Sequence, residues 1–285
     1  MGATTTEIPE PPPSSTTSLL PPAPVVAKPM WIERAVVSSL EGLGEVALMF
    51  GHSVRVLLKR PLELREIVLQ MDSIGAKSMG LVVIIGSFVG MVMALQFAIG
   101  LQKFGGMEYT GRVIALSFSR ELAPTLTAVI VGGRIAAGIA AEIGSMSVTE
   151  QIDAIRALGA DPIKKLVMPR LVASVLVMPI LCSFSLVLGI GGAMAICDLQ
   201  FGLPAGFFMS TALDSMTLND FWNGFLKTPW FGAIIALIGC YYGFGTRGGT
   251  VGVGRATTQA VVATSVSILI ADFALTNVYA WVFPK

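Results

Sequence analysis

The 285-residue sequence has few charged residues. Asp, Glu, Lys and Arg together make up 13% of it, against 54% hydrophobic residues. A soluble domain of this size usually carries about 25% charged residues. Half that fraction, combined with long uncharged runs, indicates an integral membrane protein. The net charge is +1, so nothing in the composition favours a nucleic-acid partner, which would call for a strongly basic surface.

Histidine and cysteine are nearly absent as well. The single histidine, His52, excludes most His-based triads and multi-histidine metal sites. The three cysteines, Cys182, Cys197 and Cys240, stand apart inside apolar stretches without a CxxC pair, so we expect small buried side chains. The sequence also lacks the GxxxxGK(S/T) pattern of an ATP-binding loop. We therefore expect no catalytic residue, no metal and no cofactor bound by this chain.

One stretch imitates a nucleotide-binding motif. Residues 243–248, GFGTRG, fit the pattern GxGxxG. That fingerprint requires a strand before it and a helix after it in a βαβ unit, whereas in this chain it follows an apolar run of membrane-helix length. We interpret it as a flexible cytoplasmic connection between two spans.

The long apolar runs set the fold class. About 20 apolar residues in a helix cross the core of a bilayer, and five segments meet that length. The predicted spans cover residues 79–101, 117–141, 166–197, 226–246 and 256–283. The sequence therefore predicts an all-α integral membrane protein with five transmembrane helices.

Two segments precede the spans. Residues 1–29 are rich in Pro, Ser and Thr and cannot bury a core, which predicts a disordered tail ahead of a membrane domain at residues 30–285. Residues 31–58 mix apolar and charged residues too evenly for a span. They predict a helix that lies in the membrane interface, with Trp31 at the lipid headgroups.

Lys and Arg gather in alternate connections. They are frequent before the first span, between the second and third, and between the fourth and fifth, whereas residues 198–220 contain none. Lys103, Arg112 and Arg120 in the first outer connection run against this trend. The positive-inside rule then places the N-terminus in the cytoplasm and the C-terminus outside.

Residues 147–159 predict a short amphipathic helix between the second and third spans. Its start fits a capping box formed by Ser147 and Glu150, and Gly159 fits its C-terminal cap. Three apolar residues share one face and three charged residues point elsewhere: Val148, Ile152 and Ile155, against Glu150, Asp153 and Arg156. The apolar face could lie on the lipid surface or insert into a groove of a cytoplasmic protein.

Ionisable residues within or beside the spans are expensive and usually functional. Arg120 and Glu121 could contact an anionic lipid headgroup, or could form a structural ion pair at the outer end of a helix. We expect Arg134 to pair with Glu142, which lies near the same helix face, in a structural role. We expect Asp272 to have a buried partner, either in the same protein chain or across a dimer. A proton relay would need a series of titratable groups, which the sequence does not show.

Several motifs occur together in one order. They are GMV with LQ in residues 90–96, RELAP at 120–124, GR at 133–134, EIGSM at 142–146, TEQIDA at 149–154, GVGRATT at 252–258 and DFALT at 272–276. With them the sequence resembles the MlaE/YrbE permease family over residues 35–283. Ala123 stands where the family more often has Gly. The Pro-rich N-terminus lies outside the likeness.

This resemblance implies a homodimeric permease in the bacterial inner membrane. Its family works with a cytoplasmic ABC ATPase dimer, which binds ATP and Mg, and with periplasmic MCE-domain proteins, and it moves phospholipids or related lipids between the inner and outer membranes. Residues 147–159 would be the coupling helix that receives the ATPase stroke. Gly86 and Gly90 form a GxxxG pair that gives weak support to a dimer face.

The resemblance also assigns a lipid pocket. Met93, Leu101, Phe104 and Leu122 match positions that line it in the family, and Met and Phe suit variable acyl chains. Import of sterols or fatty acids by the same family is an alternative. An ATP-independent secondary transporter is a weaker one, because it would call for ion-coupling carboxylates at mid-membrane and inverted repeats.

Overall fold

The computed structural model describes residues 31–58 and 64–282, and the regular elements in those ranges are helices. Among the described residues, those from Leu43 onward form one compact unit, which contains the helical bundle. The predicted disordered tail, residues 1–29, lies outside the described residues. The α-helices are α1 (Trp31–Leu58), α2 (Leu64–Gln102), α3 (Thr110–Ser117), α4 (Ala123–Val148), α5 (Gln151–Ala157), α6 (Met168–Phe201), α7 (Ala205–Ser215), α8 (Leu218–Phe244) and α9 (Gly249–Val282).

Five helical segments of the described chain are long and apolar enough to cross a membrane, judged by length and composition. They are Leu64–Gln102, Met107–Val148, Ile163–Phe201, Leu218–Phe244 and Gly249–Trp281. The predicted number of spans is therefore confirmed, but each of the five segments is longer than predicted. Apolar runs mark only the part of a helix that suits lipid, whereas α2 continues through Asp72 and Lys77 because no Pro or Gly pair breaks it there.

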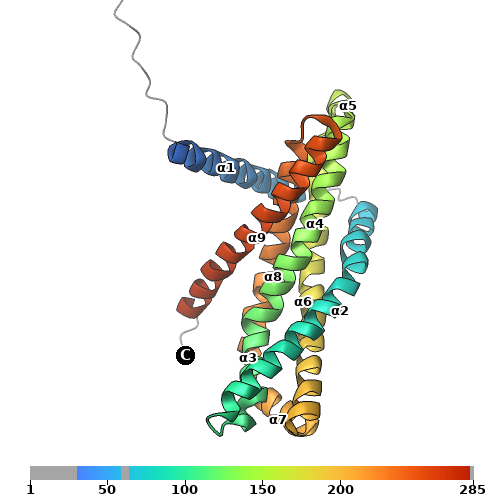
Figure 1. Ribbon diagram of the computed structural model, residues 1–285. Coiled ribbons are helices and arrows are strands. Elements are labelled where there is room, and N and C mark those ends of the chain that lie inside the picture. Colours follow the sequence, from blue (N-terminus) through green and yellow to red (C-terminus); the bar gives the residue numbers. More distant parts are fainter. Residues whose placement is uncertain (1–30, 59–63, 283–285) are drawn as a thin grey trace, which may run out of the picture. The chain divides into compact units, whose positions relative to one another are not determined.

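The long helices pack in two sets. α4 packs against α8 and α9, and α2 runs along α6 (Figure 1). Gly86 and Gly90 of α2 face the backbone of Ser185 and Gly189 of α6, so closely that a Cβ atom on Gly90 would overlap the Gly189 carbonyl. The GxxxG pair thus serves close packing within one chain, and the prediction that it forms a dimer face is wrong for these contacts.

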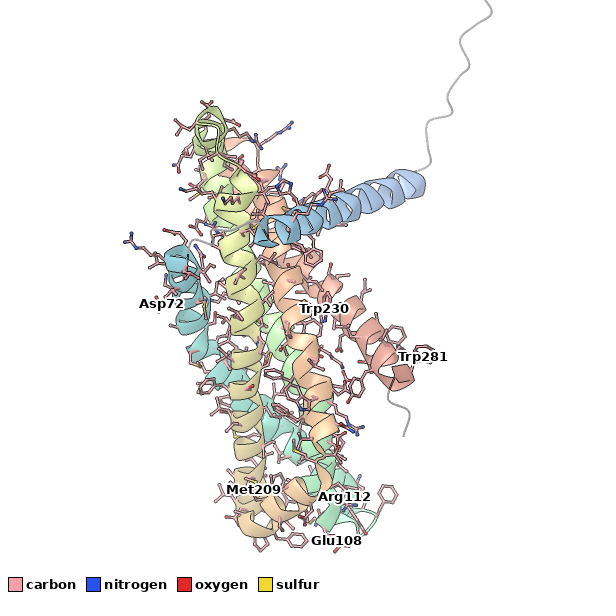
Figure 2. The ribbon with its side chains drawn as sticks, turned by 180° about the vertical axis from the view of Figure 1, so that it is seen from behind. Asp72, Glu108, Arg112, Met209, Trp230 and Trp281 are labelled. Carbon is pink, nitrogen blue, oxygen red and sulfur yellow. The ribbon has the colours of Figure 1, made fainter. Side chains whose placement is uncertain are left out.

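The two ends of the bundle carry different elements. α3 and α7 lie at one end, where Glu108, Arg112 and Met209 are found, and α5 lies at the other end beside the α8–α9 connection (Figures 1 and 2). The helix α7 was not predicted. Residues 243–248 end the helix α8 and begin the connection to α9, so a helix precedes them instead of the strand that a dinucleotide fingerprint requires.

The predicted coupling helix is shorter than residues 147–159. α4 continues to Val148, so Ser147 belongs to α4, and α5 begins at Gln151 after Glu150, whose φ is 58°. No side-chain hydrogen bond caps α5, and the predicted capping box is wrong. Its C-terminal end is as predicted: Gly159 has a φ of 76°, and its backbone N–H donates to the Arg156 carbonyl at 2.9 Å.

Candidate functional site

Arg120 and Glu121 lie in a π-helical turn, Phe118–Leu122, between α3 and α4. Single π-helical turns inside longer helices shift the side-chain register and are frequent at functional sites. α8 passes this turn closely, because Gly224 has no Cβ atom that would overlap the Ser119 carbonyl. The glycine therefore lets the side chains of α8 reach those of the π turn.

Lys227 of α8 is the centre of a buried charge network. Its side chain is 3% exposed, and its ammonium group donates to both carboxylate oxygens of Glu121, at 2.9 and 2.8 Å. It also donates to Asp272 Oδ1 at 3.2 Å and to Thr276 Oγ1 at 2.7 Å, both on α9. One ammonium group thus connects the π turn, α8 and α9. A buried charge is tolerated when it is paired and hydrogen-bonded in this way.

Arg120 pairs with a different carboxylate. Its Nε donates to Asp220 Oδ1 at 2.7 Å, and its Nη2 contacts the same oxygen. Asp220 also accepts from the backbone N–H and the hydroxyl of Thr217, at 3.0 and 2.8 Å. The first of these bonds, together with the Asp220 backbone N–H that donates to the Thr217 side chain, forms the capping box that starts α8. Nη1 of Arg120 has no hydrogen-bond partner among the described residues, and the side chain is partly exposed.

The network holds two positive and three negative formal charges, on Arg120, Lys227, Glu121, Asp220 and Asp272. The expected partner of Asp272 is therefore Lys227 of the same chain. The sequence analysis did not predict that Lys227 and Asp220 belong to the site, because both precede the uncharged run of the fourth span. One signal could have indicated Lys227: it lies within the bounds of a predicted span, and other spans contain acidic residues that need a partner.

Arg134 and Glu142 do not pair with each other, so that expectation is wrong. Arg134 of α4 donates from Nη1 to Ser78 Oγ of α2 at 2.7 Å. Glu142 instead forms an ion pair at 2.8 Å with Arg170 of α6, whose side chain is buried. Both residues tie α4 to a neighbouring helix, which a spacing argument along one helix could not reveal.

The four predicted lipid-pocket residues lie at the end of the bundle that holds α3. Met93, Leu101 and Leu122 are partly buried, whereas Phe104 is 88% exposed. In a single chain Phe104 therefore projects from the surface. The structure does not enclose these four side chains together within the described chain.

The face of α5 that was expected to contact a partner points inward. Ile152 is 4% exposed in the main hydrophobic core, and Ile155 packs against that core. Val148, Glu150, Asp153 and Arg156 are exposed, and Arg156 Nη1 donates to Asp153 Oδ1 at 3.0 Å. A cavity of about 420 Å³ separates α5 from the α8–α9 connection. The exposed side chains of α5 itself are therefore mainly polar, and the exposed Leu158 follows directly after it.

An ion pair joins α1 to the segment that follows α5. His52 Nε2 lies 2.8 Å from Asp161 Oδ2, and the Ile163 backbone N–H donates to Asp161 Oδ1 at 2.9 Å. Burial alone would raise the pKa of Asp161. The hydrogen bonds from His52 and the backbone, together with the positive charge of His52 when it is protonated, outweigh burial and hold the pKa below its usual value.

Five apolar helices and charges buried among them define a multi-pass, all-helical membrane protein. The family described as Permease MlaE matches residues 67–278. The chain belongs to this family, and it is an ABC transporter permease, the membrane subunit of a transporter. ABC permeases in general associate with an ATPase and with substrate-binding partners.

Curated relatives cover most of the chain. The chloroplastic protein Trigalactosyldiacylglycerol 1 of Arabidopsis thaliana is 38% identical over 234 residues, which cover 82% of this chain and 67% of the relative. A probable ABC transporter permease protein of Synechocystis is 39% identical over 246 residues, 86% of this chain and 90% of the relative. One from Rickettsia typhi is 37% identical over 246 residues, 86% and 95% of the two chains.

Proposed function

We propose that this chain is the permease of a lipid transporter. As a homodimer in the bacterial inner membrane, it moves phospholipids or related lipids between that membrane and a periplasmic MCE-domain protein that serves the outer membrane. A separate cytoplasmic ATPase dimer, which binds ATP and Mg, drives the movement. Family membership supports this proposal, as does the name of the Arabidopsis relative, which is that of a galactolipid.

The observation that carries the lipid proposal is the unused donor of Arg120. Asp220 engages Nε and Nη2 of the guanidinium, while Nη1 has no partner among the described residues. A guanidinium group has five N–H donors, so it can hold a carboxylate and still donate to a phosphate. The two hypotheses for Arg120, structural ion pair and headgroup contact, are therefore compatible.

Apolar surface beside Arg120 suits the acyl chains. Moving one methylene group from an apolar environment into water costs about 0.8 kcal/mol. A lipid therefore needs a continuous apolar path as it leaves the bilayer. Phe104, Leu101, Met93 and Leu122 offer such surface at the same end of the bundle. A second copy of the chain, packed against this surface, would complete the enclosure that one chain lacks.

Mass spectrometry of lipids bound to the purified complex tests the lipid proposal. We expect phospholipid in the wild-type complex and a loss of several-fold in Arg120→Ala. Arg112→Ala, which removes an exposed cation at the same end of the bundle, is the matched control and should retain wild-type occupancy. Equal occupancy in Arg120→Ala and wild type would refute the headgroup role. Bound sterol or fatty acid would favour those substrates instead.

The ATPase is proposed to dock on the exposed face of α5. Because Ile152 and Ile155 pack inward, we propose that Asp153, Arg156 and the exposed Leu158 contact the ATPase. We expect the charge reversal Asp153→Lys with Arg156→Glu to reduce co-purification of the ATPase. Glu108→Lys, at the opposite end of the bundle (Figure 2), should leave co-purification unchanged. Lipid transfer at an undiminished rate without any ATPase would favour a secondary transporter.

A further inference from the structure

The residues that follow α5 form one hydrogen-bonded segment with it. The Ala160 backbone N–H donates to the Ile155 carbonyl at 3.1 Å, and the Ile163 backbone N–H donates to Asp161 Oδ1 at 2.9 Å. A second π-helical turn, Ile163–Val167, then leads into α6. Because hydrogen bonds connect each step, we expect a displacement of α5 to move this second π turn with it.

Arg170, in the first turn of α6, connects the second π turn to α4. Its side chain is 4% exposed. Nη1 donates to the Leu166 carbonyl of the π turn at 2.6 Å, and Nη2 forms the ion pair with Glu142 Oε1 of α4 at 2.8 Å. Charge-assisted hydrogen bonds of this kind are about twice as strong as those between neutral groups. One buried guanidinium group therefore holds the second π turn and α4 together.

Besides the packing of Ile152 against the core, two attachments join α5 to α4. The first is the short joint at Glu150, whose φ is 58°. The second is Arg170, which engages Glu142 about 9 Å along the helix axis before α4 ends at Val148. The joint alone would let α5 pivot at Glu150 with little movement of α4. Because Arg170 engages a second point on α4, a pivot of α5 also displaces α4.

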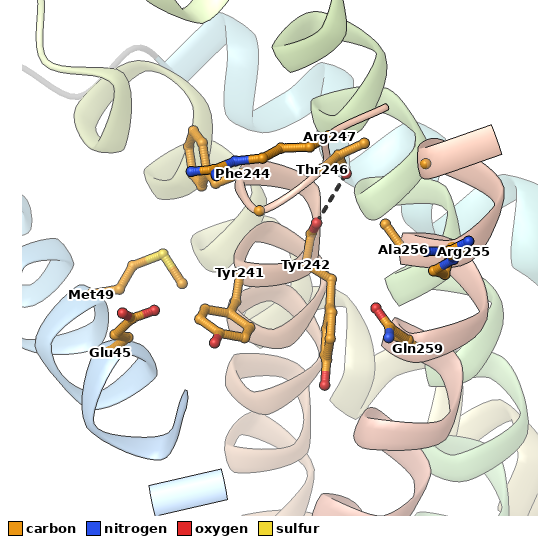
Figure 3. A pocket seen from close by; sticks show the side chains of 12 residues that line it. Glu45, Met49, Tyr241, Tyr242, Phe244, Thr246, Arg247, Arg255, Ala256 and Gln259 are labelled. Carbon is orange, nitrogen blue, oxygen red and sulfur yellow. Dashed lines mark hydrogen bonds between the residues drawn. The ribbon is translucent and has the colours of Figure 1, made fainter. Parts of the chain in front are cut away.

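The α8–α9 connection gives α5 little support from its other side. Thr246 and Arg247 of this connection line two cavities, one of about 420 Å³ towards α5 and one of about 580 Å³ between α1, α8 and α9. Figure 3 shows the larger cavity, where the Thr246 hydroxyl donates to the Tyr242 carbonyl at 3.0 Å. Because space lies on both sides of the connection, the contacts of Arg170 are the more direct route from α5 into the bundle.

One further donor of Arg170 is left unused. Nε is buried and has no hydrogen-bond partner among the described residues. Most buried polar groups are hydrogen-bonded, and an unpaired buried donor costs free energy, so this arrangement is a poor one for an ion pair that serves stability alone. The Glu142 side chain is also 48% exposed. Both features suit a contact that opens and forms again during a transport cycle.

We propose that Arg170 is a positioning residue for transport. It transmits a displacement of α5 to α4, and α4 transmits it to the first π turn, which holds Arg120. This inference rests on the proposed function, in which an ATPase acts on the exposed face of α5. Because Arg170 is buried between α4 and α6, it contacts neither the ATPase nor the lipid. Its loss therefore uncouples the two activities, so that ATP is hydrolysed while little lipid is moved.

The test measures the lipid transferred per ATP hydrolysed by the purified permease–ATPase complex in proteoliposomes, with fluorescently labelled phosphatidylethanolamine as the probe. We expect Arg170→Met to retain the ATPase and its hydrolysis of ATP, while the lipid moved per ATP falls about fivefold, the lower end of typical coupling between two sites. Glu142→Ala should lower the ratio as well, because it removes the other side of the ion pair. Arg170→Lys keeps the positive charge and should retain more coupling than Arg170→Met.

Val177→Ala, on α6, is the control for lost stability. Val177 is buried in the main core but takes no part in the ion pair, so this variant should lower the unfolding temperature without lowering the lipid moved per ATP. A wild-type ratio in both Arg170→Met and Glu142→Ala would overturn the proposal. An equal fall of the ratio in Val177→Ala, at a comparable unfolding temperature, would overturn it too.

The wild-type complex separates this inference from the proposed function. If it hydrolyses ATP and moves no lipid, the proposed function is wrong and this inference falls with it. If it moves lipid and the variants move as much per ATP, only the role of Arg170 is wrong. Should Arg170→Met not fold, Glu142→Ala carries the test, because that side chain is half exposed and its truncation leaves the core intact.

Discussion

Replacing Lys227 with methionine removes the ammonium group that holds two carboxylates in place. Methionine matches the length of the lysine side chain and fills its volume without a charge. The carboxylates of Glu121 and Asp272 would then face each other's charge without a cation between them, and Thr276 would lose its hydrogen bond from Nζ. The perturbation is therefore electrostatic, with little change in packing.

The expected magnitude follows from burial. Breaking a buried ion pair by removing one partner costs about 3–5 kcal/mol, because the remaining charge is left uncompensated. The side chain of Asp272 is 16% exposed, but that of Glu121 is 39% exposed and is partly screened by solvent. We therefore expect Lys227→Met to lower the free energy of unfolding by about 3 kcal/mol, at the lower end of this range.

Thermal unfolding of the purified protein in nanodiscs measures the loss. The matched background is Asp272→Asn, which removes one of the two carboxylates beforehand. In that background Lys227→Met should cost less, and the difference in a double-mutant cycle is the coupling energy of the pair. An unchanged unfolding temperature in Lys227→Met would refute the reasoning, because it would mean that the buried carboxylates need no cation. An identical cost in both backgrounds would refute the pairing of Lys227 with Asp272.

Four further predictions concern packing, backbone and pH. Gly224→Ala should separate α8 from the π turn, because its Cβ atom would overlap a backbone carbonyl, and should lower thermal stability by more than an alanine at an exposed helix position. Because φ of Glu150 is positive, Glu150→Gly should leave the stability of the protein unchanged or raise it by up to about 1 kcal/mol. Glu150→Val should lower it, and unfolding curves of the two variants will measure both effects. Because folding lowers the pKa of Asp161, this carboxylate stabilises the protein above its unfolded pKa, near 4, and the stabilisation is lost as the pH falls through the pKa of the folded protein. His52→Ala should shift this loss of stability to higher pH, which unfolding temperatures measured over a series of pH values will test. Ile152→Ala should detach α5 from the core at a cost of about 2–5 kcal/mol, seen as faster local hydrogen exchange of α5.

The number and order of the spans followed from the sequence because a bilayer imposes one strong requirement on a helix, a long apolar run. Helix ends were harder. α2 begins at Leu64 rather than at residue 79, because charged residues such as Asp72 end an apolar run without ending a helix. The helix α7 escaped notice because its residues are apolar but too few to span. Caps outside the lipid are set by local contacts, as the true capping box at Thr217 and Asp220 illustrates.

The candidate site was predictable in part. Arg120, Glu121 and Asp272 stood out because charges near the membrane are costly. Their partners did not, because Lys227 and Asp220 approach them only when α8 packs across α4 and α9. Periodicity along one helix also led to the wrong prediction that Arg134 forms an ion pair with Glu142. Long-range pairing depends on which helix faces which, and that information is spread over packing contacts such as the one at Gly224.

α4 connects the two ends of the protein on which its proposed function depends. It follows the π turn that holds Arg120 and Glu121, and it runs without interruption to Val148 beside α5. α5 is fixed to the bundle by Ile152 and is joined to α4 by only two residues, of which Glu150 has a left-handed backbone. We therefore expect a force applied to the exposed face of α5 to reach α4 through this short joint and through the packing of Ile152 against the core. Because Lys227 links the π turn to α8 and α9, such a displacement at one end would strain the charge network at the other, where Arg120 is proposed to hold the lipid.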